Sequence, residues 1–428
     1  MTQKEKVLKF LEEAAEVPLL SGELAVVLGV PDGEREKLEE ILAELTDEGL
    51  VVCTKKKRYG AAMKLGYIKG KFCGTERGFG FVEQEDGEDL FIPPDSTGGA
   101  LHGDLVLAKV TMAAEQTKRQ EGVVMSVLRR SQSVLVGSYE KSGSGGYVVL
   151  DDKRMPVDLF IPEAASGGAK DGDKVVAEVV RWESRKRNPE GKITEVLGNR
   201  LEVGVDIRSI LRQHGIPEQF PREARQEAQR AAASDIGNEA ENRVDFRDHL
   251  IFTIDGDDAK DLDDAVEIRR LEDGGYRLGV HIADIGHYVR RGGALDKEAF
   301  KRGTSVYLVD RVIPMLPVEL SNGICSLNEG VDRLALSVIM DIGADGNVTR
   351  HEIAKSVIRS KARMTYHDVT AILEGDKSLR ERYSFLLESI LLMKELKDIL
   401  RKRRMARGGI DFDFPEAKVI LDADGRPV

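Results

Sequence analysis

The pentapeptide Asp-Leu-Phe-Ile-Pro occupies residues 89–93 and returns unchanged at residues 158–162. The dipeptide Gly103-Asp104 returns as Gly172-Asp173, so both matches share an offset of 69 residues. Around both copies, short runs of alternating apolar and polar residues are separated by Gly and Asp-Gly turns, a pattern typical of strands. An internal repeat of this kind predicts two tandem β-barrels of about seventy residues each, rather than one large sheet.

The first copy carries aromatic residues in the run Arg-Gly-Phe-Gly-Phe-Val at residues 77–82. Because side chains alternate along a strand, Phe79 and Phe81 are expected on one face, which the intervening glycine leaves open for stacked bases. The alternative is that these rings belong to the barrel core. Together with nearby aromatic and basic residues, the segment resembles the ribonucleoprotein motifs of cold-shock domains, which are OB-type barrels. The residues predicted to bind RNA on this face are Lys69, Lys71, Arg77, Phe79, Phe81 and Phe91. The positions 69 residues later hold Val148 and Leu150, which predicts a second barrel without a stacking surface.

The N-terminal segment predicts three helices followed by a β-hairpin. Apolar spacing indicates helices over residues 3–15 and 21–28, and a third helix that ends near Asp47 before Gly49. The run from Leu50 to Gly60 then reads as a strand with a basic tip. We predict a winged helix-turn-helix, although a protein-interaction domain that never contacts nucleic acid fits this segment equally well.

The charge of the chain is segregated along the sequence. The 428 residues include 64 Lys and Arg and 75 Asp and Glu, which gives a net charge of −11. Residues 49–72 nevertheless hold seven basic residues and no acidic one, and further basic clusters lie at 185–187 and 401–404. No apolar run is long enough to span a membrane, no signal peptide is visible, and the three cysteines lie far apart, so we expect a cytoplasmic protein.

An acidic cluster between two apolar runs indicates the chemistry. Residues 255–264 contain six aspartates within ten residues, with His-Leu-Ile-Phe-Thr-Ile before them and Ala-Val-Glu-Ile after them. Such close carboxylates repel one another unless a cation neutralises them. An EF-hand is excluded, because Ala259 and Lys260 stand where that loop requires Asp or Asn and then Gly. An oxygen-liking ion, Mg²⁺, therefore fits better than a solvated loop, and magnesium held by carboxylates is suited to phosphodiester hydrolysis.

Four motifs make the resemblance to a known family specific. They are TIDGDDAKDLDDAV (253–266), GVHIADIGHYV (279–289), RGTSVYLVDRVIPMLP (302–317) and LSNGICSLNEGVDRLALSV (320–338). These motifs resemble the catalytic domain of the ribonuclease II superfamily of 3′→5′ exoribonucleases. The resemblance implies that Asp255 and Asp264 bind the metal with Asp261 in support, that cleavage depends most on Asp263, and that Tyr366 stacks on the 3′-terminal base.

The resemblance covers the whole chain and implies a multi-domain α+β fold with two OB-type cold-shock barrels. The expected parts are a winged helix-turn-helix (1–60), a first cold-shock barrel (61–125), a second (126–197), a connecting segment (198–248) and the first part of a mixed α/β ribonuclease II-type catalytic domain (249–428). It also implies Mg²⁺ as cofactor, a monomer, and single-stranded or 3′-tailed structured RNA as partner. Association with ribosomes or tmRNA is a further implication of the family, and no membrane partner is expected.

Two alternatives to an active exoribonuclease follow from the sequence. The family's catalytic domain continues beyond residue 428 with an arginine that grips phosphate and a second base-stacking aromatic, so the catalytic domain is expected to be truncated. This chain could then bind RNA while degrading it poorly or not at all. A winged-helix transcription regulator is disfavoured, because it leaves the aspartates unexplained.

Overall fold

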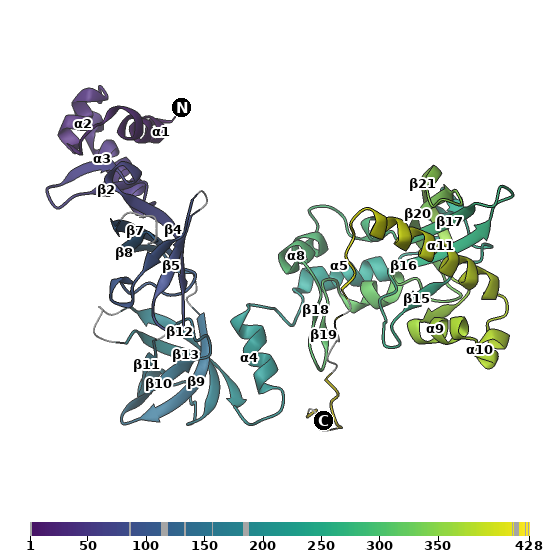
Figure 1. Cartoon of the computed structure of the whole chain (residues 1–428). Helices are drawn as coiled ribbons and strands as arrows, with labels where there is room; N and C mark the ends of the chain where they lie inside the picture. The colour runs from purple at the N-terminus through teal and green to yellow at the C-terminus, as the bar shows by residue number, and fades with distance from the viewer. Residues whose placement is uncertain are drawn as a thin grey trace. The chain divides into compact units, whose positions relative to one another are not determined.

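The computed structural model describes every residue except 1, 85–86, 113–118, 132–133, 156, 183–187, 413, 415–418, 424 and 427. The chain divides into two compact units, Met1–Ile216 and Pro217–Val428, and each is treated by itself (Figure 1). Within the described residues, no helix combines the length and apolar character needed to cross a bilayer. The basic residues 185–187 lie outside the described part of the chain.

The first unit opens with the predicted winged helix. Its helices are α1 (Gln3–Lys9), continued by a π-helical segment (Phe10–Ala14), α2 (Ser21–Val27) and α3 (Arg35–Asp47). The wing is a three-stranded sheet in the order β1 (Leu19–Leu20), β3 (Arg58–Ala61) and β2 (Val51–Cys53). Leu11, Leu24 and Leu42 are fully buried between the helices and the sheet, which explains the apolar spacing in the sequence. The basic run Lys55–Lys57 forms the exposed tip of the wing.

Two closed five-stranded barrels follow, as the repeat predicts. The first contains β4 (Tyr67–Gly74), β5 (Gly80–Glu83), β6 (Leu90–Ile92), β7 (Leu105–Met112) and β8 (Glu121–Arg129). The second contains β9 (Val134–Ser142), β10 (Gly145–Leu150), β11 (Leu159–Pro162), β12 (Asp173–Arg181) and β13 (Glu190–Asn199). The fold class inferred from the repeat is therefore confirmed.

The repeated motifs have the same structural role in both barrels. The Leu and Ile of each pentapeptide point inward and are fully buried, at 90 and 92 in the first copy and 159 and 161 in the second. Asp104 is buried and accepts a hydrogen bond from the Leu101 backbone N–H at 2.8 Å, and Asp173 accepts one from the Lys170 N–H at 2.8 Å. Both aspartates thus close the turn that leads into the fourth strand of their barrel, β7 in the first and β12 in the second.

The expected domain limits stay predictions, and two of them fall inside or beside strands. The limit between residues 125 and 126 lies within β8, and the limit at 197 lies near the end of β13. The segment after the second barrel begins with α4 (Val205–Gln213), whose Val205 packs on Val136, Val176 and Leu197 of that barrel.

The second unit is a mixed α/β domain around a five-stranded sheet. The sheet order is β14 (Val244–Asp245), β21 (Val348–Arg359), β20 (Asp332–Ile342), β17 (Tyr276–Ala283) and β16 (Asp264–Arg270). A second, two-stranded sheet pairs β15 (Thr253–Asp255) with β22 (Arg363–Thr365), and a hairpin joins β18 (Val306–Tyr307) to β19 (Val312–Ile313). The α-helices of this unit are α5 (Arg222–Ala232), α6 (Gly237–Ala240), α7 (Ile285–Tyr288), α8 (Ala294–Arg302), α9 (Tyr366–Glu374), α10 (Lys377–Arg382) and α11 (Leu387–Ala406).

The long helix α11 lies along the five-stranded sheet (Figure 1). Its Leu392 and Leu396 pack against Ile268, Tyr276 and Ile342 of that sheet. The basic cluster 401–404 belongs to the last turns of this helix, where Arg401 and Arg404 form ion pairs with Asp411.

Candidate functional site

The acidic segment is a loop that joins the two sheets of the second unit. Asp255 ends β15, where it is the register partner of Thr365 on the parallel strand β22. Asp264 begins β16, where it is the partner of Ile282 on the antiparallel strand β17. Because both ends of the loop are fixed by strand pairing, the intervening aspartates are confined to the place where the two sheets approach each other.

Backbone hydrogen bonds hold the loop from two further sides. The hydroxyl of Ser326 accepts the Leu262 N–H at 3.0 Å and donates to the Lys260 carbonyl at 3.0 Å. These two contacts bracket Asp261, and the backbone of Leu327 donates to the Leu262 carbonyl at 2.9 Å. On the other side, the Arg363 guanidinium donates to the carbonyls of residues 257 and 259 at 3.0 and 2.8 Å. These hydrogen bonds hold the loop through its backbone atoms, so they do not use the carboxylates of its aspartates.

Burial and neighbouring carboxylates raise the pKa of two aspartates of this loop, Asp255 and Asp263. Partial burial, and then the charge of Asp264, raises the pKa of Asp255 above its usual range, while the Arg363 charge lowers it. Partial loss of water likewise raises the pKa of Asp263, and the charges of Asp261 and Asp264 add to this shift. One carboxylate oxygen of Asp255, Oδ2, is buried without a hydrogen-bond partner. A buried, unpartnered oxygen among repelling carboxylates fits a hard cation.

The metal ligands themselves stay a prediction. In the described part of the chain, no three His, Cys, Asp or Glu side chains are grouped closely enough to hold one ion as they stand. The structure brings Asp255, Asp261, Asp263 and Asp264 into one loop, within electrostatic range of each other, but not into a closed coordination shell.

A tyrosine that the sequence reasoning did not single out contacts this loop. The Tyr307 hydroxyl, at the end of β18, donates to Asp261 Oδ2 at 3.4 Å, and the charge of that aspartate is the largest cause of the raised pKa of Tyr307. Its side chain is 69% exposed, so its ring is open to a ligand. Tyr366, the tyrosine expected to stack on the terminal base, begins α9 and is also exposed, next to the register partner of Asp255. The signal for Tyr307 was its place in the third motif, RGTSVYLVDRVIPMLP.

The aromatic face predicted on the first barrel is present. The ring centroids of Phe79, Phe81 and Phe91 lie 5.7 to 5.9 Å apart, and all three rings are half-buried. The barrel core is formed by other residues, namely Phe72, Val82, Leu90, Ile92, Ala100, Val106, Ala108 and Val124. The alternative that the three rings are core residues is therefore wrong. The side chains of Lys69, Lys71 and Arg77 are exposed beside them.

The prediction that the second barrel has no aromatic surface is wrong. Val148 and Leu150, the positions 69 residues after Phe79 and Phe81, are buried in the barrel core. In the first barrel Phe81 is the register partner of Phe91, and in the second Tyr147 is the register partner of Phe160. The turn between β9 and β10 is shorter than the turn between β4 and β5. The offset of 69 residues between the two repeats therefore does not hold in this hairpin. The true counterpart of Phe81 is Tyr147.

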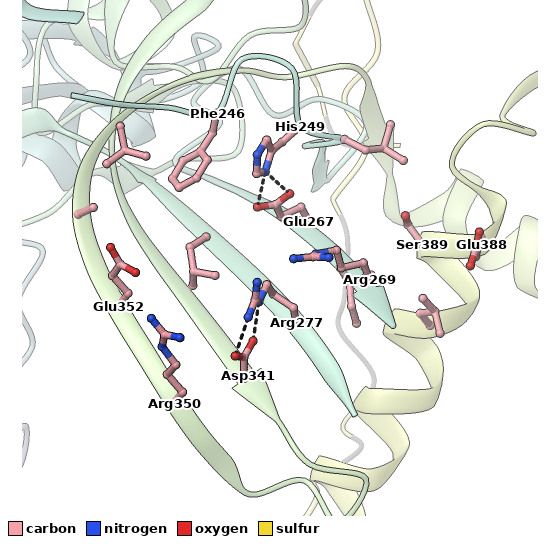
Figure 2. Close-up of a pocket in the computed structure, with 16 residues that line it drawn as sticks. Phe246, His249, Glu267, Arg269, Arg277, Asp341, Arg350, Glu352, Glu388 and Ser389 are labelled. Carbon is pink, nitrogen blue, oxygen red and sulfur yellow. Dashed lines mark hydrogen bonds and ion pairs between the residues drawn. The ribbon is translucent and has the colours of Figure 1, made fainter. Parts of the chain in front are cut away.

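A separate cavity of about 730 Å³ lies over one face of the five-stranded sheet, bordered by α11 (Figure 2). Within it, His249 Nδ1 pairs with the Glu267 carboxylate at 2.9 Å, and Arg277 Nε pairs with Asp341 at 2.5 Å (Figure 2). None of the four predicted active-site aspartates lines this cavity. It is therefore distinct from the acidic loop.

The fold, the aromatic face of the first barrel and the acidic loop together define a class of protein. Its members have a winged helix and two OB-type barrels, the first with an aromatic face beside basic residues, followed by an α/β domain with an acidic loop. Comparison with known families agrees with this division. The RNB domain family matches residues 243–428, the ribonuclease B OB domain family matches 70–127, and the cold shock domain family matches 147–221. The chain belongs to the ribonuclease R family of the ribonuclease II superfamily.

Individual relatives support the assignment over most of this chain. It is 42% identical over 402 residues to ribonuclease R of Thermotoga maritima, covering 92% of this chain and 56% of the relative. It is 39% identical over 414 residues to ribonuclease R of Escherichia coli, covering 96% of this chain and 51% of the relative. The chain thus spans about half the length of the curated relatives that it matches.

A solved structure shows the same fold. Mycoplasma genitalium RNase R in complex with ribose-methylated single-stranded RNA superposes with a TM-score of 0.76 at 23% identity. The match covers 84% of this chain and 57% of that chain.

Proposed function

We propose that this chain acts in the 3′→5′ exonucleolytic hydrolysis of RNA to nucleoside 5′-monophosphates, with Mg²⁺ as cofactor, as a ribonuclease of the ribonuclease R type. The observation that carries the proposal is the acidic loop. Hydrogen bonds to its backbone hold the loop in place, and one oxygen of the partly buried Asp255 carboxylate has no hydrogen-bond partner. The family membership of the chain supports the same activity.

In this proposal the four aspartates have separate roles. Asp255 and Asp264, at the two strand ends, would hold the ion with support from Asp261, and bound Mg²⁺ would supply charge neutralisation at the phosphate and a more acidic water. Asp263 is the aspartate on which cleavage would depend most. Burial, and then the charges of Asp261 and Asp264, raise its pKa in the ion-free protein, so its charged form is disfavoured there relative to a free aspartate.

The RNA would approach this loop with its 3′ end. The exposed tyrosines at 307 and 366 offer rings near the two ends of the loop on which a terminal base could stack. Upstream nucleotides would bind the aromatic face of the first barrel, where the three phenylalanines provide stacking and the neighbouring lysines attract phosphate. That the Mycoplasma relative was solved with single-stranded RNA supports RNA as the partner. The monomeric state, the ribosome or tmRNA association and the cytoplasmic location stay predictions.

The second candidate is an RNA-binding protein without efficient catalysis. It is favoured by the absence, among the described residues, of three side chains already grouped to bind one ion. Product analysis separates the two candidates. Residues 1–428, and a chimera that continues them with the remaining part of the Thermotoga relative, are incubated in Mg²⁺ or EDTA with 3′-tailed RNA whose backbone phosphates are labelled throughout. Mg²⁺-dependent release of 5′-monophosphates from the 3′ end supports the exonuclease, and RNA binding without any release by either protein supports the second candidate.

A further inference from the structure

The cavity over the five-stranded sheet has a row of charged side chains at one end (Figure 2). Strand register places four residues side by side across β16, β17, β20 and β21, namely Arg269, Arg277, Asp341 and Arg350. Arg277 neutralises Asp341 through two hydrogen bonds, of 2.5 and 2.7 Å. Arg269 and Arg350 are exposed, and among the described residues no carboxylate pairs with either guanidinium. The row therefore keeps two positive charges that can attract an anion.

Beyond this arginine row the cavity wall becomes acidic. The other carboxylates that line the cavity belong to Glu267, Glu352 and Glu388. Glu267 lies two positions from Arg269 on β16, and Glu352 lies two positions from Arg350 on β21, so each pair shares one face of its strand. These carboxylates would repel a second phosphate group, whereas hydroxyl groups could donate to them. The cavity therefore suits a ligand with one anionic group next to hydroxyls, and the successive phosphates of an RNA strand do not match it.

Polar contacts fix the Glu267 carboxylate in the middle of the cavity. Its Oε2 lies 2.9 Å from His249 Nδ1, and its Oε1 lies 3.7 Å from His281 Nε2. His281 is fully buried, and its Nδ1 lies 2.6 Å from Ser337 Oγ, which contacts Ser356 Oγ at 2.6 Å. The carboxylate is therefore positioned before a ligand arrives, which lowers the entropy cost of binding one.

The far end of the cavity is aromatic. The ring centroids of Phe246 and His249 lie 4.8 Å apart at an interplanar angle of 58°, and Leu250 adds apolar lining. The ring of Phe246 also lies 5.7 Å from that of His281, which is four residues along β17 from Arg277. At about 3.3 Å per residue, about 13 Å separates the aromatic end from the arginine row. A small inorganic anion cannot contact both ends, whereas an elongated molecule can.

We infer that this cavity binds a free nucleoside 5′-monophosphate, which carries one phosphate, ribose hydroxyls and an aromatic base in the order of the three zones. The phosphate would lie at Arg269 and Arg277, since guanidinium groups bind phosphate oxygens in pairs. The ribose hydroxyls would donate to Glu267, and the base would pack against the rings of Phe246 and His249. A cavity of about 730 Å³ lies within the range of about 300–1,000 Å³ that is typical of small-molecule sites. The inference is independent of the proposed function, because the predicted active-site aspartates do not line this cavity.

The test is titration calorimetry of the whole chain with AMP in EDTA, with adenosine, inorganic phosphate and 2′,3′-dideoxy-AMP as matched ligands. AMP is expected to bind with a Kd below about 1 mM. Adenosine lacks the phosphate and inorganic phosphate lacks the base, so each should bind at least about tenfold more weakly than AMP. The dideoxy nucleotide lacks the hydroxyls that would donate to Glu267 and should bind at least about threefold more weakly.

Substitutions then locate the bound nucleotide. Arg269→Ala, at an exposed residue of the edge strand β16, is expected to raise Kd for AMP at least about tenfold. Phe246→Leu keeps apolar bulk but loses the ring and should also weaken binding. Arg290→Ala, at an exposed arginine outside the cavity, is the matched control and should bind like the unaltered chain. If thermal unfolding shows that Phe246→Leu is misfolded, Arg269→Ala decides.

Three results would overturn the inference. The first is that AMP does not bind to the unaltered chain, and the second is that Arg269→Ala binds AMP within about twofold of it. The third is that Tyr307→Ala loses AMP binding while Arg269→Ala keeps it, which would place the nucleotide at the acidic loop. The proposed function would stand in each case, because the products released from RNA test it separately.

Discussion

The hydroxyl of Ser326 accepts a hydrogen bond from the backbone N–H of Leu262 at 3.0 Å, across 64 residues of sequence. The same hydroxyl donates to the carbonyl of Lys260. The backbone carbonyl of Ser326 accepts a hydrogen bond from Arg333 Nε at 2.8 Å. Ser326 is completely buried. A small hydroxyl residue therefore connects the acidic loop to the rest of the second unit through main-chain atoms.

Substitution of Ser326 by Ala should loosen the acidic loop. The Leu262 N–H is buried and would lose its partner, which costs about 1–3 kcal/mol. We expect a lower free energy of unfolding by that amount in urea, and weaker Mn²⁺ binding by titration calorimetry. Ser384→Ala, at an exposed serine, is the control and should change neither value. Equal stability of both variants would show that Ser326 does not hold the loop.

Asp263→Asn should stabilise the ion-free protein at neutral pH. A carboxyl whose pKa is higher in the folded than in the unfolded protein favours folding when protonated, below the unfolded pKa of about 4. That contribution is lost as the pH rises through the folded pKa, so the charged aspartate opposes folding at pH 7. We expect a higher Tm for the variant in EDTA at pH 7, a difference that shrinks toward pH 4, and a smaller difference in Mg²⁺.

The matched control for this measurement is Asp258→Asn, in the same loop at an exposed position. It should change Tm less than Asp263→Asn at pH 7. A difference between Asp263→Asn and the unaltered protein that grows as the pH falls would contradict the raised pKa.

The aromatic face of the first barrel should carry part of the RNA affinity. Phe81→Ala with Phe91→Ala removes two stacking rings without touching the buried core, so we expect Kd for single-stranded RNA to rise at least about fivefold, at about 1–3 kcal/mol per base. Lys377→Ala, at an exposed residue of α10, is the charge control and should bind normally. Unchanged affinity in the double alanine variant would mean that RNA does not use this face.

The two exposed tyrosines near the acidic loop can be ranked by substitution. Because the Tyr307 hydroxyl reaches Asp261, Tyr307→Ala should lower the hydrolysis rate of the chimera, or change the length of its shortest product, more than Tyr366→Ala does. Gel analysis of the products measures both effects. A larger effect of Tyr366→Ala would contradict this ranking and would support the expected role of Tyr366 as the base-stacking tyrosine.

The sequence was sufficient for features that depend on local pattern. The repeated pentapeptide predicted two barrels because its Leu and Ile must face inward in both copies, and the acidic run predicted one loop because apolar strands flank it. The aromatic face around Phe81 followed from strand alternation in the same way.

Features that depend on turn length or on distant contacts could not be read from the sequence. Tyr147 was missed because the shorter turn between β9 and β10 shifts the hairpin register relative to the rest of the repeat. Tyr307 and Ser326 lie in the third and fourth motifs, but they were missed because each reaches the acidic loop across 46 or 64 residues of sequence, and a motif does not say which of its side chains makes such a contact.

The central claim is that the acidic loop performs the hydrolysis of RNA, and a pair of loop variants in the chimera tests it most directly. Single-turnover hydrolysis of 3′-tailed RNA in Mg²⁺ is measured for the unaltered chimera, Asp263→Asn and Asp258→Asn, with RNA affinity measured in EDTA for each. We predict that Asp263→Asn slows release of 5′-monophosphates by more than about 100-fold, a loss of more than about 2.7 kcal/mol, while RNA affinity stays within threefold and Asp258→Asn remains active. Hydrolysis by Asp263→Asn within tenfold of the unaltered chimera would contradict the account.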